Sequence, residues 1–436
     1  MKRNFYQIHE QISDNCYLHY NTLNDQFIFL DKYAHLIYTN AIDLNDICIK
    51  DKKLFDNLVH LGFVIPDDYD EKAIVELRRR KEQHDMSLYH IVINPTLDCN
   101  LSCWYCYENK IKKSHISQDV IEGIKKNIET HYKFNAYNTL KISFFGGEPL
   151  LYFTAIEDIC NFANDFCKKN KITLLLDFTT NGTLIKNRYL NFLSEYNCTF
   201  QITLDGNRNQ HNKIKHFENK DIDTYKLTID NILNTQKTIS NSLIYLRINF
   251  DEKTLKNFDD ILNDINLLDR KRTTIILKKI WQVDSNKINK KDITSAIQKL
   301  FNLGFIVDYY TQGKLCFGER LNEVVINYDG NVFKCTTINS FDKEHSFGKL
   351  DTNTGFIVWD ENKLSHLTLD LCQKRCRECK LYPTCYGPCN FHLIKGHYGC
   401  YLDSINLSMS EYLMFLVKLK RQEIMVFNKD ANKTKP

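Results

Sequence analysis

Three cysteines crowd into one short stretch of this chain of 436 residues. Cys99, Cys103 and Cys106 are spaced C-x3-C-x2-C within the segment NPTLDCNLSCWYCYENK. Thiolates are ligands for soft metals, which in proteins means zinc or iron–sulfur clusters. Structural zinc takes four ligands, usually arranged as pairs. Three clustered thiols suit a cubic [4Fe–4S] cluster in which one iron has no protein ligand. That iron is free to bind a small molecule through a nitrogen and an oxygen.

Four further motifs follow the cysteines at expected strand ends. FFGGEP (144–149) ends the second strand of the region, TTNGT (179–183) the third and ITLDG (202–206) the fourth, while LRINF (246–250) lies on the fifth. The glycine pair removes two side chains, so that backbone can approach a ligand closely. A lone GG or NG is an ordinary turn signal. Four such strand ends in order predict a site at the carboxyl edge of a parallel sheet.

CNLSCWYC and the strand-end motifs together resemble the radical S-adenosylmethionine (SAM) enzymes. The resemblance implies that the open iron binds the amino and carboxylate groups of SAM. Electron transfer from the cluster then gives a 5′-deoxyadenosyl radical, which abstracts hydrogen from a substrate. The resemblance makes Cys99, Cys103 and Cys106 the catalytic cluster ligands. It also implies a set of SAM-site residues: Tyr105, Gly146, Gly147, Glu148, Pro149, Thr180, Asn181, Asp205 and Arg247.

Plainer alternatives exist for these residues. The three cysteines could instead hold zinc or belong to a core. Asp205 and Arg247 could each belong to a structural ion pair.

A second group of cysteines lies near the end of the chain. YDGNVFKC and CRECKLYPTCYGPC resemble the two halves of the SPASM domain, which carries two auxiliary [4Fe–4S] clusters in radical SAM peptide-modifying enzymes. The resemblance assigns the first auxiliary cluster to Cys316, Cys335 and Cys389. It assigns the second to Cys376, Cys379, Cys385 and Cys400. The alternative is a zinc ribbon, because C-x2-C pairs also suit zinc.

The first auxiliary set departs from the SPASM pattern. Some members have a further cysteine shortly after the first one, whereas CFGERLNEV has none after Cys316. Either this cluster has an open iron, or another residue such as Cys372 completes it.

The elements that must position these motifs form an α/β pattern. Apolar strands alternate with amphipathic helices, which indicates a parallel sheet built from βα units and predicts a partial (β/α)6 TIM-like barrel. The expected strands are 89–95, 140–146, 172–180, 199–205, 242–250 and 272–280. A small winged-helix-like module precedes the barrel, and a cysteine-rich iron–sulfur (SPASM) domain follows it. The expected domains are 1–86, 87–295 for the radical SAM core, 296–415 for the SPASM domain, and 416–436 for a closing helix and tail.

Composition narrows the class of protein. The chain is 43% hydrophobic and 26% charged, which is typical of a globular protein. A formal charge of +4 gives no electrostatic argument for nucleic acid. No apolar run approaches about 18 residues, and the start MKRNFYQIHE is no signal peptide, so we expect a cytoplasmic protein without a membrane span. Sixteen cysteines in a reducing compartment favour metal ligation over disulfides.

The leading hypothesis is a maturase of ribosomally made peptides, a class known as RiPP maturases. The SAM site and three [4Fe–4S] clusters would install a thioether or carbon–carbon crosslink or a similar modification. Residues around 17–30 could bind the leader of the precursor peptide as an added strand, or the module could simply cap the barrel. An electron donor such as flavodoxin or ferredoxin is implied.

Two other functions remain open. A sulfatase maturase has similar architecture, but those enzymes carry an aspartate directly after the second SPASM cysteine, where this chain has Thr336. The third hypothesis is a non-catalytic protein that uses clusters for electron relay or binding.

Overall fold

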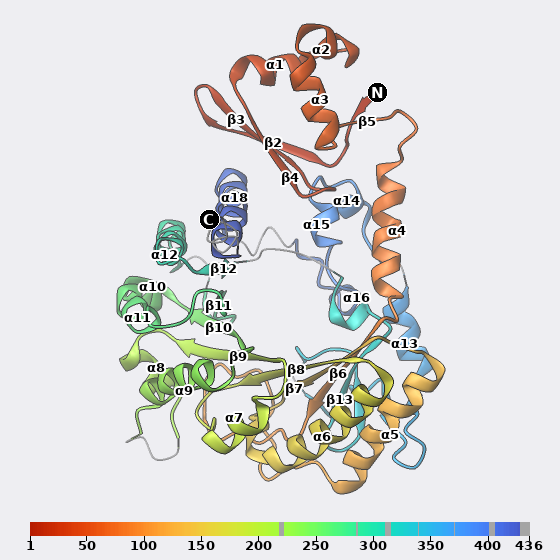
Figure 1. The fold of residues 1–436 in the computed structure, drawn as a ribbon, viewed down its shortest axis with the longest axis vertical. Helices are drawn as coiled ribbons and strands as arrows, with labels where there is room; N and C mark the ends of the chain where they lie inside the picture. Colours follow the sequence, from red (N-terminus) through yellow and green to blue (C-terminus); the bar gives the residue numbers. More distant parts are fainter. Residues whose placement is uncertain are drawn as a thin grey trace, which may run out of the picture. The chain divides into compact units, whose positions relative to one another are not determined.

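Two compact units make up the chain in the computed structural model (Figure 1). The structure describes residues 1–217, 222–284, 287–309, 315–338, 340–369, 371–400 and 406–427. The first unit combines Met1–His84, Tyr310–Arg320 and His366–Arg421, and the second combines Asp85–Tyr309, Leu321–Ser365 and Gln422–Pro436. Across these described ranges, no helix has the length and apolar character that a bilayer crossing requires.

The second unit is built on a sheet of eleven strands. Seven consecutive strands are parallel neighbours, in the spatial order β12-β11-β10-β9-β8-β7-β6. Their bounds are β6 (Leu88–Asn94), β7 (Thr139–Phe144), β8 (Thr173–Thr180), β9 (Cys198–Asp205), β10 (Leu243–Phe250), β11 (Thr273–Lys279) and β12 (Ile306–Asp308). All six strands predicted from the sequence form, and the predicted α/β class with a partial barrel is confirmed.

The sheet also extends past β6, which the sequence did not predict. β13 (Glu323–Asn327) pairs in parallel with β6, and Val325 lies opposite Val92. Three short antiparallel strands follow: β14 (Asn331–Phe333), β15 (Gly348–Leu350) and β16 (Ile357–Trp359). These strands are three to five residues long, too short for a clear periodicity. As a result β6 has a partner strand on both sides.

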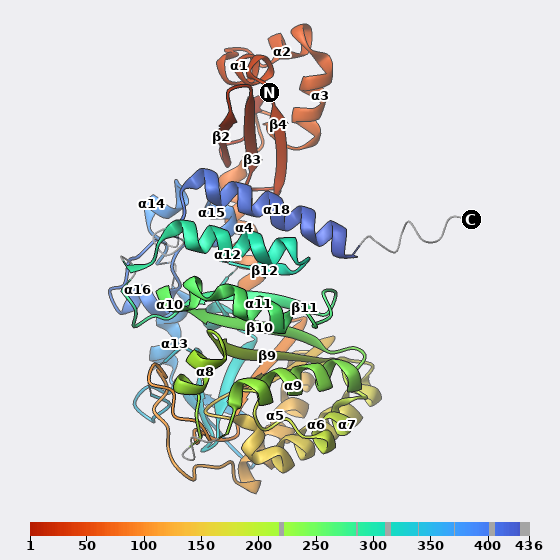
Figure 2. The same ribbon diagram turned by 90° about the vertical axis from the view of Figure 1, so that its left-hand side faces the viewer.

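Helices follow the parallel strands and lie along the outer face of the sheet (Figures 1 and 2). They are α5 (Gln118–Phe134), α6 (Phe153–Asn170), α7 (Asn187–Leu193), α8 (Arg208–Ile214), α9 (Thr224–Thr238), α10 (Glu252–Lys256), α11 (Phe258–Ile265) and α12 (Lys290–Asn302). α5 shows why they form. Its N-cap Ser117 accepts a hydrogen bond from the amide of Val120, and Ile121, Ile124 and Ile128 repeat at helical spacing and are buried. Because the strands are parallel, their carboxyl ends meet at one edge.

The first unit begins with a small module of sheet and helices. β2 (Gln7–Ser13), β3 (Cys16–Asn21) and β4 (Gln26–Leu30) form an antiparallel sheet with β3 in the middle, and β1 (Lys2–Arg3) pairs with β5 (Val64–Ile65). Its helices are α1 (Lys32–Asn40), α2 (Asn45–Lys50), α3 (Lys52–His60) and α4 (Glu71–Gln83). Leu30, Tyr38, Ile47, Leu58 and Phe63 lie in its core.

Among the described residues, the later part of the first unit holds short elements and then the closing helix. These are η3 (Phe317–Glu319), α14 (Lys374–Arg377), α15 (Tyr382–Cys385), α16 (Asn390–Ile394) and α18 (Met409–Phe427); α13 (Glu361–Thr368) precedes them. Leu381 and Leu413 share a small buried core with Leu18 and Tyr20 of the sheet. Arg79 and Glu319 form a buried ion pair with an N–O distance of 2.9 Å. In the described residues, buried apolar side chains of this part join cores that they share with the N-terminal module.

A buried imidazole pair makes the stability of the N-terminal module depend on pH. Nε2 of His19 lies 2.9 Å from Nδ1 of His35, and the ring of His9 stacks on His19. Burial and, to a smaller extent, the charges of His9 and His35 together lower the pKa of His19 to about 3. Between pH 6.5 and 3 the unfolded chain binds more protons at His19 than the folded chain does. Stability is therefore complete above pH 6.5 and falls by up to about 1.4 kcal/mol for each pH unit below it.

We expect amide hydrogen exchange over residues 16–38, corrected for intrinsic rates, to accelerate between pH 7 and pH 5. In the variant His19→Phe that acceleration should shrink. An equal acceleration in both proteins would contradict this explanation.

Candidate active site

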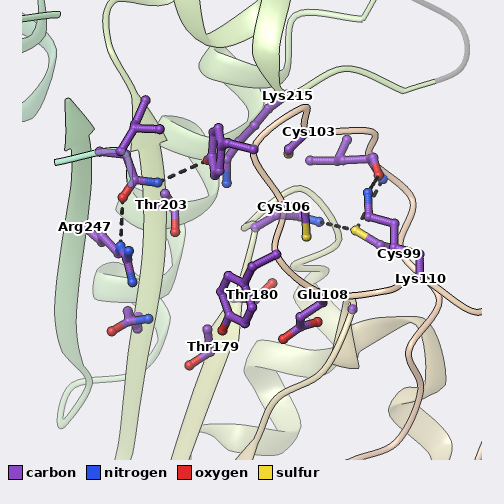
Figure 3. Close-up of a pocket in the computed structure, with 18 of the residues that line it drawn as sticks. Cys99, Cys103, Cys106, Glu108, Lys110, Thr179, Thr180, Thr203, Lys215 and Arg247 are labelled. Carbon is purple, nitrogen blue, oxygen red and sulfur yellow. Dashed lines mark hydrogen bonds between the residues drawn. The ribbon is translucent and has the colours of Figure 1, made fainter. Parts of the chain in front are cut away.

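The three clustered cysteines lie on the loop that follows β6. This loop and the ends of the neighbouring strands line a single pocket, in which Figure 3 shows Cys99, Cys103 and Cys106. Cys99 is buried, Cys103 is half-buried and Cys106 is exposed. The structure therefore brings the three predicted cysteines together at the predicted edge of the sheet.

Hydrogen bonds at its base hold the cysteine loop in place. One carboxylate oxygen of Asp98 accepts from the amide of Cys99 at 2.8 Å, and the other accepts from the amide of Lys113 at 2.8 Å. Thr96 donates to the carbonyl of Ser114 at 2.6 Å. These hydrogen bonds join the two ends of the loop. They hold in place the backbone to which the three thiols are attached.

The two glycines of FFGGEP pack against this loop. The amide of Gly147 donates to the carbonyl of Thr96 at 3.1 Å, and the amide of Glu148 donates to the carbonyl of Asp98 at 2.9 Å. A Cβ on Gly147 would lie 2.2 Å from the Asp98 carbonyl oxygen, and one on Gly146 would lie 2.3 Å from that of Thr96. The sequence predicted that bare backbone would serve a ligand. Both glycines line the pocket, and they are also required for the backbone of the cysteine loop to fit.

Glu148 lies behind the pocket wall, fully buried, and holds two strand ends together. Its carboxylate accepts from the hydroxyl of Thr180 and the amide of Asn181, both at 2.8 Å, and from the amide of Leu150 at 3.1 Å. Burial raises the pKa of Glu148, and these hydrogen bonds act in the opposite direction. Pro149 is buried, begins the 3-10 turn η1 (Pro149–Tyr152) and also lies outside the pocket lining.

Asn181 connects the third strand end to the cysteine loop. Its side-chain amide donates to the Oδ1 of Asn100 at 2.9 Å and lies 3.9 Å from the Sγ of Cys99. Asn100 in turn donates to the hydroxyl of Thr183 at 2.9 Å. Asn181 and Thr180 both line the pocket, as the sequence predicted.

Asp205 organises a buried polar network beneath the pocket. Both of its oxygens accept from the hydroxyl of Tyr105 at 2.7 Å, and Asn249 donates to it at 3.1 Å. The Nζ of Lys215 lies 3.7 Å away. Burial, followed by the charge of Asp205, raises the pKa of Tyr105 well above its ordinary value. Asp205 is fully buried and does not line the pocket. It acts on the pocket through Tyr105, which does line it.

Arg247 lines the pocket and joins the same polar network through Asn249. Its Nε donates to Oδ1 of Asn249 at 2.8 Å (Figure 3), while the ion pair of Asp205 is with Lys215. Thus the structural ion pair considered from the sequence forms with Lys215.

Removing the Asp205 charge should destabilise the second unit. Asp205→Ala would leave the buried ammonium of Lys215 without this partner, which costs about 3–5 kcal/mol. Anaerobic urea denaturation measures the change. As a control, Asp230→Ala removes the exposed ion pair with Lys226 and should change stability by less than about 1 kcal/mol. Equal effects of the two substitutions would contradict the buried network.

Several lining residues were not predicted from the sequence. The pocket wall also contains Glu108, Lys110, Gln201, Thr203, Lys215, Lys279, Trp281 and Gln282. Gln201 and Thr203 alternate along β9, and their strand period could have identified them. Lys110 and Lys215 come from irregular segments, where no periodic signal exists. With Arg247 and Lys279 they give the lining four basic residues against one acid, Glu108, which favours a ligand with a carboxylate.

Burial sets the protonation of the acidic groups in the pocket. It raises the pKa of Cys99 to about 11, with a further contribution from Glu148, and it raises the pKa of Cys103. It also raises the pKa of Glu108 to about 7. The two cysteines are therefore thiols at neutral pH until a metal displaces their protons.

The donor set fits an iron–sulfur cluster better than a single ion. Among the described residues, no three His, Cys, Asp or Glu side chains converge as a site for one metal ion. In a cubane each thiolate binds a different iron, so three sulfurs distributed around one pocket match it. Neutral histidine, the commonest partner of cysteine at zinc, is not among the residues that line this pocket.

The later cysteines lie in both units. Cys376, Cys379, Cys385 and Cys400 of the first unit act electrostatically on one another, and burial followed by these neighbours raises the pKa of Cys385 to about 12. Cys389 has its pKa lowered to about 7, first by a hydrogen bond with Cys316. Cys335 follows β14 in the second unit, where the hydroxyl of Tyr107 donates to the carbonyl of Thr336 at 3.4 Å. The assignment of these residues to two clusters stays a prediction.

Comparisons with known proteins agree with this arrangement. The family model described as the Radical SAM superfamily matches residues 93–265. The chain is 24% identical to the radical SAM cyclopropyl synthase TigE of Paramaledivibacter caminithermalis, over 99% of this chain and 95% of that protein. It is 26% identical to a cysteine-type anaerobic sulfatase-maturating enzyme of Clostridium novyi, over 70% of this chain and 88% of that protein.

Other matches are shorter or more remote in sequence. A segment of 117 residues is 36% identical to an uncharacterised protein of Methanocaldococcus jannaschii, and it spans 27% of this chain and 38% of that protein. Native anSMEcpe with bound AdoMet and the Cp18Cys peptide has the same fold, with a TM-score of 0.55, 18% identity and coverage of 78% of this chain and 99% of that chain. The cysteine loop, the strand ends beside it and the family match agree: the chain contains a radical SAM domain over residues 93–265.

Proposed function

We propose that this protein is a radical SAM peptide maturase that forms a crosslink, thioether or carbon–carbon, or a similar modification in a ribosomally made peptide. The observation that carries the proposal is the pocket in which Cys99, Cys103 and Cys106 meet the glycine pair and Asn181. The radical SAM superfamily implies SAM and a [4Fe–4S] cluster at these thiols. When bound, that pair supplies the 5′-deoxyadenosyl radical, which takes a hydrogen atom from the substrate.

The protein's own part in this reaction is positioning. The cysteine loop presents three thiols on a backbone fixed by Asp98, and the backbone of Gly146 and Gly147 forms the adjoining wall. Arg247 and Lys279 offer positive charge to the carboxylate of SAM. Tyr105, held by Asp205, fixes the end of the loop between two cysteines. Trp281 and Tyr107, with ring centres 5.5 Å apart, add aromatic surface to the pocket lining.

Two auxiliary clusters complete the proposed cofactor set. The first would use Cys316, Cys335 and Cys389, and the second Cys376, Cys379, Cys385 and Cys400. They would carry electrons from a donor such as flavodoxin or ferredoxin. TigE, a cyclopropyl synthase that matches along 99% of this chain, supports carbon–carbon bond formation.

A second candidate function is formylglycine formation in sulfatases. The Clostridium novyi relative and the fold of anSMEcpe favour it. Thr336 counts against it, because sulfatase maturases carry an aspartate at that position as a proposed base.

One experiment separates the two candidates. The reconstituted protein is incubated anaerobically with SAM, a reductant and either of two peptides. One is the product of a small open reading frame beside the gene, and the other is a cysteine-containing sulfatase peptide. We expect 5′-deoxyadenosine in both mixtures. Loss of about two hydrogens, roughly 2 Da, should occur only in the first peptide. Loss of sulfur from the second peptide would establish the sulfatase alternative, and absence of 5′-deoxyadenosine would contradict both.

The N-terminal module is the proposed binding site for the leader of the precursor peptide. β4 is an edge strand of the three-stranded sheet, so its outer backbone groups are open to an added strand. Phe29 on β4 is 49% exposed and Tyr33 at the start of α1 is 68% exposed. An extended peptide beside β4 would cover both rings.

A substitution at this edge tests leader binding. Phe29→Asp should weaken binding of the precursor peptide about tenfold or more, since it removes apolar contact and adds charge. Fluorescence anisotropy of the labelled peptide measures it. Ile49→Asp, at an exposed position of α2, is the matched control and should leave affinity unchanged. Equal affinities of both variants and the parent would show that the module only caps the barrel.

A further inference from the structure

Cys372 was considered from the sequence as a residue that could complete the first auxiliary cluster. In the structure its sulfur lies close to that of Cys376, within the first unit. A Cβ built on Gly387 would lie 3.4 Å from the Sγ of Cys376 and 3.6 Å from the Sγ of Cys372, so both sulfurs border the same point of the chain. Cys372 also makes a hydrogen-bond contact of 4.0 Å with the carbonyl of Tyr386.

The local backbone is shaped to bring these sulfurs together. Tyr386 has φ 49° and Gly387 has φ 78°, both in the left-handed region. Two successive residues in that region turn the chain sharply between Cys385 and Cys389. The amide of Gly387 then points back to the Sγ of Cys385 at 3.5 Å. The turn thus gathers thiols from three segments around one point.

The cysteine thiols around this turn number one more than the thiolates that a [4Fe–4S] cluster binds. The amide of Cys379 donates to the carbonyl of Cys376 at 2.9 Å, so these two cysteines share one turn of the chain. The side chain of Arg375, next to Cys376, donates to the carbonyl of Tyr398, which brings the segment that carries Cys400 to the same place. The group therefore has five thiols, whereas a [4Fe–4S] cluster has four irons to bind.

Two of the five thiols, those of Cys372 and Cys400, differ in burial. Cys372 is half-buried and packs against the core formed by Tyr6, Val75 and Tyr382. Cys400 is exposed, at the end of a stretch in which residues 394–400 are all exposed. The sequence motif assigns the fourth ligand to Cys400, but the thiol anchored to the core is Cys372.

We propose that Cys372 is an alternative fourth ligand of the second auxiliary cluster and exchanges with Cys400 at one iron. In the exchange one Fe–S bond forms as the other breaks. The entering thiol of Cys372 releases a proton, and the departing thiolate of Cys400 takes one up, so no oxidant or reductant is needed. Either Cys372 or Cys400 would then supply the fourth thiolate of this cluster. This inference rests on the proposed function, because it needs an auxiliary cluster at these cysteines.

The test removes the barrel cluster first, so that only auxiliary iron is counted. In a background of Cys99→Ala, Cys103→Ala and Cys106→Ala, three variants are compared: Cys372→Ser, Cys400→Ser and the double variant. Iron per chain is measured after anaerobic purification, and low-temperature EPR after mild oxidation reports a [3Fe–4S] signal. We expect both single variants to match the background. The double variant should lose between one and four irons of about eight per chain and show the [3Fe–4S] signal if it loses one. Cys16→Ser, outside the group, is the control.

Other outcomes overturn the proposal. If Cys400→Ser alone loses as much iron as the double variant, or if the double variant retains all of it, Cys372 is not a ligand. If Cys372→Ser alone loses iron, it belongs to the first auxiliary cluster. A background protein without iron would instead contradict the auxiliary clusters of the proposed function.

A second measurement needs only one substitution in the full-length protein. In holo Cys400→Ser, Cys372 should be protected from iodoacetamide and become reactive when iron is chelated. Mass spectrometry of the peptide that contains Cys372 measures this. Equal labelling before and after chelation would overturn the exchange even if the double variant fails to fold.

Discussion

Replacing Cys103 with alanine is expected to abolish reductive cleavage of SAM. Cys103 is the middle ligand of the C-x3-C-x2-C loop and lies in the pocket between Cys99 and Cys106. Two thiols cannot retain a cubane whose remaining ligand is a small molecule, so we expect the protein to lose about four irons per chain. Formation of 5′-deoxyadenosine should fall to the level of a reaction without enzyme. Anaerobic iron analysis and chromatography of the nucleoside measure the two effects.

Cys48→Ala is the matched control for this experiment. Cys48 lies on α2 of the N-terminal module, outside both cysteine groups, and alanine is a good helix residue. It should keep its iron and its activity. If Cys103→Ala retained full activity, or if pure protein contained zinc in place of iron, the three thiols would have a structural role and the proposed function would be wrong.

Gly147→Ala should have the second largest effect, although it removes no ligand. The new methyl group would lie 2.2 Å from the Asp98 carbonyl oxygen, a backbone atom that cannot rotate away. The amide hydrogen bonds that join Gly147 and Glu148 to the cysteine loop must then lengthen. We expect a loss of about 1–3 kcal/mol in stability, as for other overpacked sites. The displaced loop should also reduce iron loading and weaken SAM binding by at least about tenfold.

The matched control for this glycine is Gly399→Ala. Gly399 has no heavy atom within 4 Å of an added Cβ, and its φ is not in the left-handed region. Iron content, equilibrium dialysis with SAM and urea denaturation should separate the two variants. If Gly147→Ala bound SAM with the parent's affinity, the packing of the glycine pair on the loop would not determine the site.

The sequence predicted those parts of the molecule that depend on local pattern. The six long strands have regular apolar runs. The spacing of the three cysteines indicated an iron–sulfur cluster. The resemblance to the radical SAM enzymes implied the pocket residues at strand ends, such as Thr180 and Asn181, and the rule that parallel strands end at one edge predicted that such strand ends would share a site. Short strands such as β13 were missed because five residues carry too little periodicity.

The directions and partners of side chains could not be predicted from the sequence. The sequence located Glu148 and Asp205 at strand ends, but only the structure shows that both carboxylates are buried and bind backbone amides or Tyr105. Lys215, which pairs with Asp205, lies in an irregular segment ten residues further along the chain. Contacts of this kind depend on how loops fold back on the sheet, which no spacing rule describes.

The pairing of β13 with β6 has a consequence for how the protein acquires its metal. Because β6 has neighbours on both sides, the strand that carries the cysteine loop is an interior strand, and its amides stay hydrogen-bonded whether or not iron is present. For β6 to leave the sheet, both β7 and β13 would have to detach from it. We therefore expect the backbone that carries the cysteine loop to form before any cluster is inserted.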